Sequence, residues 1–308
     1  PARLSCYIWR PGKWERAHAY REGERMLVDL VEVTTTDGLT LGGAYMAAAD
    51  ADRLSPIDCL CFFHGDGGHF YRRLYLELGA RLAARGVAFL AANRRGHDWV
   101  SRGARGGGLQ GYAHESVEAA RLDYAAWLAL LHERGHKAIA MSGHSGGAVR
   151  AVYAQAKEHF AGVNAVVSVS PGEYHHQGII DMCGEAFENL YRQAQAFVDE
   201  GQPEAYLKVD MPFRAMWTAQ AFVDSFHPDN RYSLTSHAAE TGCPTLFVFG
   251  AEECAGPQVE PTAGLAMRQL RAADFAHVTV DVIEGANHAY AGREVALFES
   301  IWGWLAAL

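Results

Sequence analysis

The sequence has little basic charge, no long apolar segment and no paired cysteine motif. Its 308 residues carry 27 lysines and arginines against 36 aspartates and glutamates, which gives a formal net charge of −9. This balance argues against general nucleic-acid binding, which needs a basic surface. No apolar run approaches the roughly 20 residues of a membrane-spanning helix, and the first residues lack the apolar segment of a secretory signal. We therefore expect no nucleic-acid and no membrane partner.

The six cysteines are scattered along the chain, and none belongs to a CxxC pair. Cys59 and Cys61 alternate within an apolar run, so they are expected on one face of a strand. Isolated thiols of this kind are typical of buried cysteines in a reducing compartment, which predicts a cytoplasmic protein. The adjacent His175 and His176 have no cysteine or carboxylate partner at ligand spacing, so no metal site is predicted.

Short apolar strands alternate with amphipathic helices along most of the chain. Strands are expected at 25–33, 39–46, 57–63, 87–92, 138–141, 163–170, 245–250 and 277–283, and helices at 71–85, 115–134, 146–159, 262–273 and from 293 onward. The first two strands flank Asp37-Gly38, which is a hairpin signal. The later strands are continuous apolar runs, as in a parallel sheet that is covered on both faces. The pattern predicts an α/β fold, with a mostly parallel eight-stranded sheet between helices.

One long segment interrupts this alternation. Residues 171–241 contain two helix-like stretches, at 185–201 and 212–226, and no clear strand. We expect a helical lid there, inserted into a core domain made of residues 1–170 and 242–308.

A serine among glycines follows a short apolar run. Residues 141–147 read MSGHSGG, and Ser145 lies between the expected strand 138–141 and the expected helix 146–159. Glycine loses the most backbone freedom on folding, so three glycines in five residues indicate a turn with no room for side chains. In a G-x-S-x-G elbow, such a turn exposes the hydroxyl at a strand end, beside the positive end of a helix. Ser145 is therefore the candidate nucleophile.

A serine hydroxyl needs a general base, and the base needs an acid that orients it. In this architecture the acid and then the histidine follow the serine along the chain. His288 follows the last expected strand and is the candidate base. Glu252 and Glu253 follow the strand 245–250, where the acid is expected. Glu253 is preferred for its position three residues after Gly250, and Glu252 is the alternative.

Glycines also follow the strand 57–63, in the run HGDGG. Backbone N–H groups of such a loop can face a developing oxyanion, together with the N–H that follows the elbow serine. Asp66 and Gly146 are the candidate donors, and the Asp66 carboxylate is expected to point away from the site. The residues expected beside the substrate near these donors are His64, Gly65 and His144.

Other side chains near the expected strand ends are candidates for substrate contacts. Arg95 belongs to an arginine-rich loop, and a guanidinium there can bind a substrate carboxylate or phosphate. The alternative is that these arginines are solvated or pair with acidic residues. Tyr174 and His175 begin the insertion, and Trp217 lies in its second helix-like stretch.

Together these residues resemble the alpha/beta-hydrolase superfamily. The resemblance spans about residues 25–306 and is carried by HGDGG (64–68), NRRGHD (93–98), GHSGG (143–147), PTLFVFGAEE (244–253) and GANH (285–288). It implies a nucleophile, acid and histidine on the loops at the sheet's carboxyl edge. The sequence departs from the usual pattern in offering glutamate in place of aspartate as the acid. A serine nucleophile argues against haloalkane dehalogenase or epoxide hydrolase chemistry, because those relatives use aspartate there.

The resulting hypothesis is a serine hydrolase that acts on a carboxylic ester, lactone or thioester of a small molecule and needs no cofactor. One alternative is a carbon–carbon bond hydrolase or lyase that uses the same triad and anchors a polar substrate through Arg95. Another is a binding protein whose fold has lost catalysis, since a fold alone does not name a function. The oligomeric state stays open, with a homodimer as one possibility.

Overall fold

The computed structural model describes residues 7–10, 13–16, 28–49, 54–212, 214–255 and 261–308. Within them, eight strands form one sheet in the order β12-β11-β8-β7-β5-β6-β4-β3. These strands are β3 (Asp29–Thr34), β4 (Thr40–Met46), β5 (Cys59–Phe63), β6 (Ala88–Ala92), β7 (Ile139–His144), β8 (Val163–Val169), β11 (Thr245–Gly250) and β12 (Val278–Ile283). β4 is antiparallel to both β3 and β6, and the other neighbours are parallel. The predicted mostly parallel eight-stranded sheet is confirmed.

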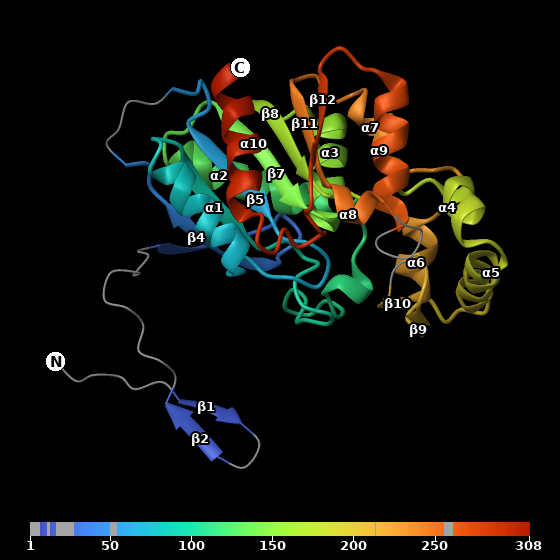
Figure 1. The fold of residues 1–308 in the computed structure, drawn as a ribbon. Helices are drawn as coiled ribbons and strands as arrows, with labels where there is room; N and C mark the ends of the chain where they lie inside the picture. Colours follow the sequence, from blue (N-terminus) through green and yellow to red (C-terminus); the bar gives the residue numbers. More distant parts are fainter. Residues whose placement is uncertain (1–6, 11–12, 17–27, 50–53, 213, 256–260) are drawn as a thin grey trace.

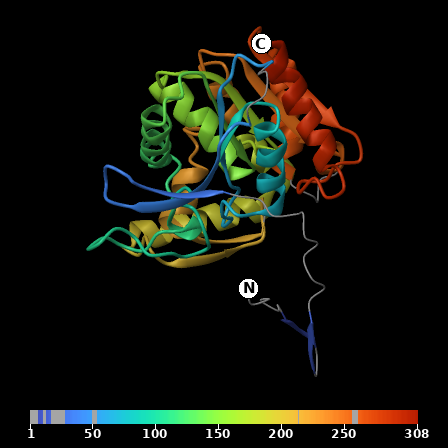
Figure 2. The ribbon, with the colours of Figure 1, turned by 90° about the vertical axis from the view of Figure 1, so that its left-hand side faces the viewer.

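Helices cover both faces of this sheet (Figures 1 and 2). They are α1 (Arg73–Ala83), α2 (Ala120–Glu133), α3 (Gly146–Glu158), α7 (Leu234–Ala238), α8 (Ala251–Cys254), α9 (Pro261–Ala273) and α10 (Glu294–Ala307). Figure 2 shows α1 and α10 on one face of the sheet and α2 and α3 on the other. This arrangement explains the continuous apolar runs, because every side chain of β5 and β6 is buried.

The hairpin that opens the sheet forms at the expected turn. Gly38 has a φ of +87°, which glycine adopts without strain, and its N–H donates to Thr35 O at 2.9 Å. The first residues of the strand expected at 25–33 lie outside the described residues. The described chain also contains a separate antiparallel hairpin of β1 (Tyr7–Arg10) and β2 (Lys13–Arg16), which was not predicted from the sequence.

The helix expected at 115–134 begins later than predicted. A short 3₁₀ turn, Tyr112–His114, precedes it, and α2 starts only at Ala120. Glu115, at the predicted start, is fully buried and forms ion pairs with Arg94 and Arg150. These buried pairs hold the segment before α2 against the neighbouring loop.

The insertion between β8 and β11 is not wholly helical. Its helices are α4 (His176–Cys183), α5 (Glu185–Asp199) and α6 (Ala219–Ser225), and it also holds an antiparallel hairpin of β9 (Tyr206–Val209) and β10 (Ala215–Thr218). The expectation of no strand there is therefore wrong. The stretch read as one helix at 212–226 splits into β10 and α6, because Thr218 ends the strand and accepts the Ala221 N–H as a helix cap.

The loops that follow β5, β7, β8, β11 and β12 gather at one edge of the sheet, since these strands are parallel. In Figure 1 the hairpin β9–β10 and the helices α4 to α6 lie beyond this edge. Among the described helices, none is long and apolar enough to span a membrane.

Candidate active site

Ser145 stands at a sharp junction between β7 and α3. Its φ of 56° and ψ of −126° are strained for a residue with a side chain, and its N–H donates to Val169 O at 2.8 Å. The glycines around it make the close approach possible. A Cβ on Gly143 would lie 2.8 Å from Ala148 N, and one on Gly147 would lie 2.8 Å from Phe63 O. The backbone therefore has the geometry expected of a nucleophile elbow.

His288 and Glu253 are joined by a short hydrogen bond. His288 Nδ1 lies 2.6 Å from Glu253 Oε2, and the Glu253 side chain is fully buried. The second oxygen, Oε1, accepts from Gly250 N and from Ser170 Oγ, each at 2.6 Å. Three donors thus fix both oxygens of the carboxylate, as an orienting acid requires. Glu252, the alternative acid, is exposed to solvent.

His144 supports the loop that carries His288. Its Nε2 lies 2.7 Å from the His288 carbonyl oxygen, and its Nδ1 lies 3.1 Å from the Tyr75 hydroxyl. Burial, reinforced by the nearby His288, lowers the pKa of His144 to about 3. A neutral imidazole satisfies both contacts when Nε2–H donates to the carbonyl and Nδ1 accepts from the phenol. His144 is therefore a positioning residue for the histidine loop.

We expect His144→Gln to flatten the acid dependence of stability. Below about pH 6.5 the unfolded histidine takes up a proton that the folded one refuses until about pH 3, so stability falls as the pH falls through this window. For one such group, the free energy of unfolding falls by ~1.4 kcal/mol for each pH unit within this window. Asp123 has the opposite effect on stability, because burial raises its pKa to about 6. It stabilises the folded state at low pH, and this stabilisation is lost as the pH rises toward about 6.

The measurement is urea unfolding at several pH values between 4.5 and 7.5. Wild type and variant share the contribution of Asp123, so their difference isolates His144. His132→Gln, at an exposed histidine, is the matched control and should keep the wild-type slope. Equal slopes for wild type and His144→Gln would contradict the neutral state assigned to His144.

The HGDGG loop packs tightly against the elbow. The fully buried His64 accepts the Arg94 N–H at Nε2 (3.2 Å), and its Nδ1 lies 2.7 Å from Gly65 O. Burial lowers the pKa of His64 well below its ordinary range. A Cβ on Gly65 would lie 3.0 Å from Ser145 Cβ, so the loop passes directly beside the serine.

The Asp66 carboxylate does not point away from the site. It lies against Gly146, lines the same cavity as Ser145, and has its Oδ1 2.7 Å from Arg94 Nη2 and 3.6 Å from Arg150 Nη1. The expectation that it turns away is therefore wrong. Two buried guanidiniums attract the carboxylate toward α3, and this outweighs the freedom of a surface side chain.

Arg94 and Arg150 also bind Glu115, which completes a buried network of two positive and two negative side chains. All but Asp66 are fully buried. Burial alone would raise the pKa of Glu115, but Arg150 and Arg94 hold it below its ordinary value. Because the four charges sum to zero, Asp66 adds little net negative charge beside the serine.

We expect Gly146→Ala to damage both stability and any activity at Ser145. The added Cβ would collide with the Asp66 carboxylate, which the two arginines hold in place. Overpacking of this kind costs about 1–3 kcal/mol, and a displaced elbow costs roughly 10²-fold in rate. Thermal unfolding and ester turnover measure both effects.

The matched control for Gly146→Ala is Gly303→Ala. Gly303 lies inside α10 with open space around its Cα, so alanine should stabilise that helix by about 0.5–1 kcal/mol. A Gly146→Ala protein with wild-type stability and turnover would contradict the tight packing of Asp66 on the elbow.

One cavity of about 330 Å³ joins most of the predicted site residues. The predicted residues that line it are Gly65, Asp66, His144, Ser145, Gly146, Tyr174 and His288. Glu253 lies behind His288 and His64 lies behind the loop, so neither lines the cavity.

The prediction that Arg95 contacts substrate is wrong in its geometry. Its guanidinium binds Asp123, with Nη2 2.7 Å from Oδ1, and Asp37, with Nη1 2.9 Å from Oδ2. Arg95 therefore joins the β3–β4 turn to α2 and does not line the cavity. The alternative of pairing with acidic residues describes it correctly.

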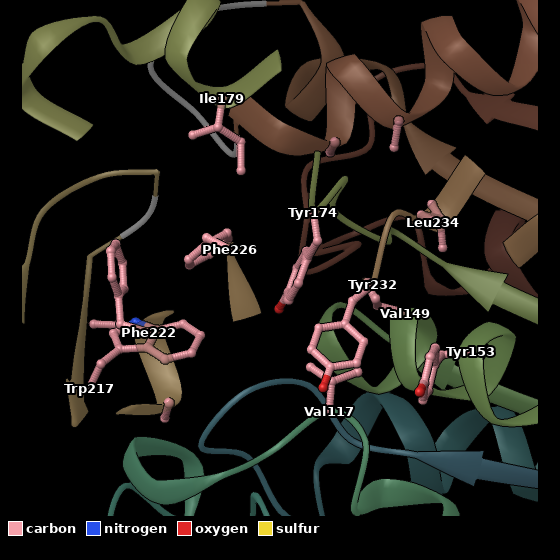
Figure 3. Packing of buried hydrophobic residues seen from close by; sticks show 14 of the residues in the cluster. Val117, Val149, Tyr153, Tyr174, Ile179, Trp217, Phe222, Phe226, Tyr232 and Leu234 are labelled. Carbon is pink, nitrogen blue, oxygen red and sulfur yellow. The ribbon is translucent and has the colours of Figure 1, made fainter. Parts of the chain in front are cut away.

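His175 and Trp217 also lie away from the cavity lining. His175 caps α4 by accepting the Gly178 N–H at 3.1 Å. Trp217 is fully buried among aromatic rings, with ring centroids 5.8 Å from Phe222 and 5.6 Å from Phe226. Figure 3 shows these three side chains grouped within the insertion. Both residues therefore have structural roles within the insertion, as a helix cap and as part of its aromatic packing.

Several residues of the cavity wall were not predicted from the sequence. They include Arg72, Trp99, Tyr112, Ser170, Arg214 and Thr262. Ser170 had a detectable signal, because it ends the predicted strand 163–170 just before Pro171. Tyr112 had none, since its position depends on the buried network that delays α2. In the part of the chain that the structure describes, no cluster of three or more histidine, cysteine, aspartate or glutamate side chains could hold a metal ion.

Comparisons with known proteins agree with this architecture. The hydrolase family profile described as serine aminopeptidase S33 matches residues 55–291. Est1E from Butyrivibrio proteoclasticus has a TM-score of 0.61 at 16% identity, over 90% of this chain and 97% of that chain. Another structure of Est1E holds ferulic acid.

Two further solved structures share the fold. An esterase domain from Rhodothermus marinus has a TM-score of 0.57 at 12% identity, over 92% of this chain and 99% of that one. Mouse alpha/beta hydrolase domain-containing protein 10 has a TM-score of 0.60 at 14% identity, over 90% and 98%. No curated protein sequence matches this chain significantly.

Proposed function

Because the chain belongs to the serine aminopeptidase S33 family of alpha/beta hydrolases, we propose that it is a serine hydrolase that cleaves a carboxylic ester, lactone or thioester of a small molecule. The observation that carries this proposal is the 2.6 Å contact between His288 Nδ1 and Glu253 Oε2, beside the cavity that Ser145 and His288 both line. The esterases among the structural neighbours support the same reaction class.

In the proposed mechanism, the Ser145 hydroxyl attacks the substrate carbonyl while His288 takes its proton. Glu253 holds the imidazole through Nδ1 and stabilises its charged form. Backbone N–H groups of Asp66 and Gly146 are the proposed donors to the tetrahedral oxyanion, at the positive end of α3. His288 then protonates the leaving alcohol or thiol. Water, activated by His288, releases the acid and restores the serine.

We propose that the insertion, residues 171–241, acts as a lid that sets the size of the substrate. Support comes from Tyr174, Arg214 and Ala215, which belong to the insertion and line the cavity. The reaction as proposed needs no cofactor, because serine, histidine and glutamate supply the nucleophile, the base and the orienting charge.

A cytoplasmic location is proposed on the state of the thiols. Cys59 and Cys61 are buried in one apolar cluster, and the described cysteines are all free. Free thiols suit a reducing compartment.

The test is a substrate panel measured on the purified wild-type chain. It contains p-nitrophenyl butyrate, γ-butyrolactone, S-butyryl thiocholine and a β-diketone, with acid release followed by pH-stat. We expect turnover of at least one of the first three. Cleavage of the diketone alone would favour carbon–carbon hydrolysis. Absence of any turnover together with absence of serine labelling would favour a binding protein.

A further inference from the structure

Two buried phenols in the cavity wall have no acceptor for their hydroxyl protons. The Tyr112 side chain is fully buried, that of Tyr174 is 2% exposed, and both line the cavity with Ser145. Among the described residues, neither hydroxyl has a hydrogen-bond acceptor. Figure 3 shows Tyr174 beside Phe226, which packs on its ring at a centroid distance of 5.2 Å. A buried hydroxyl proton without an acceptor is costly, so a cavity wall with two of them indicates that a ligand supplies the acceptor.

Both phenols serve as hydrogen-bond donors. Burial, with the nearby Asp66 charge, raises the pKa of Tyr174 to about 12 and moves that of Tyr112 well above its ordinary value. Both therefore keep their protons at neutral pH. The Arg150 guanidinium also lies near the Tyr174 oxygen, and it can only donate. The Tyr174 proton thus stays available to a ligand.

Asp66 supplies the complementary acceptor. Its carboxylate lines the same cavity, is 16% exposed, and lies against Gly146 beside the serine. Its contacts with Arg94 and Arg150 use Oδ1. No described side chain donates to Oδ2. Asp66, Tyr112 and Tyr174 therefore form a corner of the cavity that combines two O–H donors with one free carboxylate oxygen.

The charge of the corner selects among possible ligand groups. Asp66 and Glu115 balance Arg94 and Arg150. An anionic group would meet Asp66 at close range, and a cationic group would meet the two guanidiniums. A neutral group that both donates and accepts fits the corner without an unpaired charge.

We propose that the corner formed by Asp66, Tyr112 and Tyr174 binds a neutral hydroxyl group of the substrate, which donates to Asp66 and accepts from the phenols. This deepens the proposed function and rests on it, since Ser145 marks the position of the scissile carbonyl. The substrate class is then a hydroxylated ester, lactone or thioester, with its hydroxyl a few bonds from the carbonyl.

The experiment measures binding to the Ser145→Ala protein, which cannot turn over the probes. Benzyl 3-hydroxybutanoate, as each enantiomer, is compared with benzyl butanoate by ligand-observed NMR titration. We expect one hydroxy enantiomer to bind about tenfold more tightly than the unsubstituted ester. Adding Tyr174→Phe or Tyr112→Phe should reduce this ratio to about two or less.

Tyr232→Phe is the matched control, because its hydroxyl contacts Asp224 in the same insertion and does not line the cavity. This variant should keep the tenfold ratio. Thermal unfolding verifies that each variant is folded. Equal affinity for hydroxy and unsubstituted esters would overturn the inference. So would tighter binding of monobenzyl succinate, which carries a carboxylate, than of either hydroxy ester.

Fluorophosphonate labelling of the wild-type protein separates this inference from the proposed function. Labelling without a hydroxyl preference would overturn the hydroxyl corner alone. A hydroxyl preference without labelling would overturn the acyl-enzyme mechanism and leave the corner as a binding site.

Discussion

Replacing Ser145 by alanine is expected to lower kcat for p-nitrophenyl butyrate by roughly 10⁴- to 10⁶-fold. The residue supplies the attacking oxygen in the proposed mechanism, and none of the other described hydroxyls occupies its place at the β7–α3 junction. Residual catalysis would come from the backbone donors and from substrate binding. Steady-state kinetics at substrate saturation measure the effect on the chemical steps.

A second serine of the same strand provides the control. Ser142 lies in β7, three residues before Ser145, and its buried hydroxyl has no hydrogen-bond partner within the described structure. Ser142→Ala should leave kcat nearly unchanged, and both variants should unfold close to the wild-type temperature. A folded Ser145→Ala protein that keeps its ester turnover would rule out Ser145 as the nucleophile.

Glu253→Gln is expected to reduce kcat by about 10⁴-fold, as for other triads whose acid becomes an amide. Three donors around this side chain point at carboxylate oxygens: Gly250 N and Ser170 Oγ at Oε1, and His288 Nδ1 at Oε2. A glutamine has one NH₂ group in place of a carboxylate oxygen, so this donor must face either the donors at Oε1 or the donor at Oε2. If Oε1 keeps its two donors, the NH₂ faces His288 Nδ1 and favours the wrong tautomer.

Glu252→Gln is the matched control for the acid, because the two residues are adjacent and Glu252 is exposed. It should keep wild-type kcat. The pair of variants therefore decides between the two glutamates that the sequence left open. Loss of activity in Glu252→Gln, with Glu253→Gln still active, would reverse the assignment.

The sequence was sufficient for the sheet and for the elbow, because local signals specify both. Strands buried on two faces appear as continuous apolar runs, as in β5 and β6. The glycines around Ser145 reflect close backbone contacts that any side chain would disrupt. The positions of His288 and Glu253 followed from chain order at the ends of consecutive parallel strands.

Other features depend on contacts between distant segments and had no local signal. The Asp66 carboxylate turns toward the elbow because Arg94 and Arg150 reach it from two other elements. Arg95 is taken out of the site by Asp37 and Asp123, which lie on either side of it in the chain. Ion pairs of this kind form between segments that are distant in the sequence, so they become visible only in the folded structure.

The β9–β10 hairpin shows a related limit. Residues 215–218 alternate only briefly, with Met216 partly exposed between buried neighbours. A strand this short is easily included in an adjacent helical pattern, here that of α6. These residues form a strand because they pair antiparallel with β9.

The most direct test of an activated serine is the intact mass of the wild-type protein after incubation with a fluorophosphonate probe. We predict the addition of one probe per chain, mapped by peptide analysis to Ser145 and absent from Ser145→Ala. The mechanism would be contradicted if the folded wild-type protein took up no probe. It would also be contradicted if wild type and Ser145→Ala were labelled to the same extent.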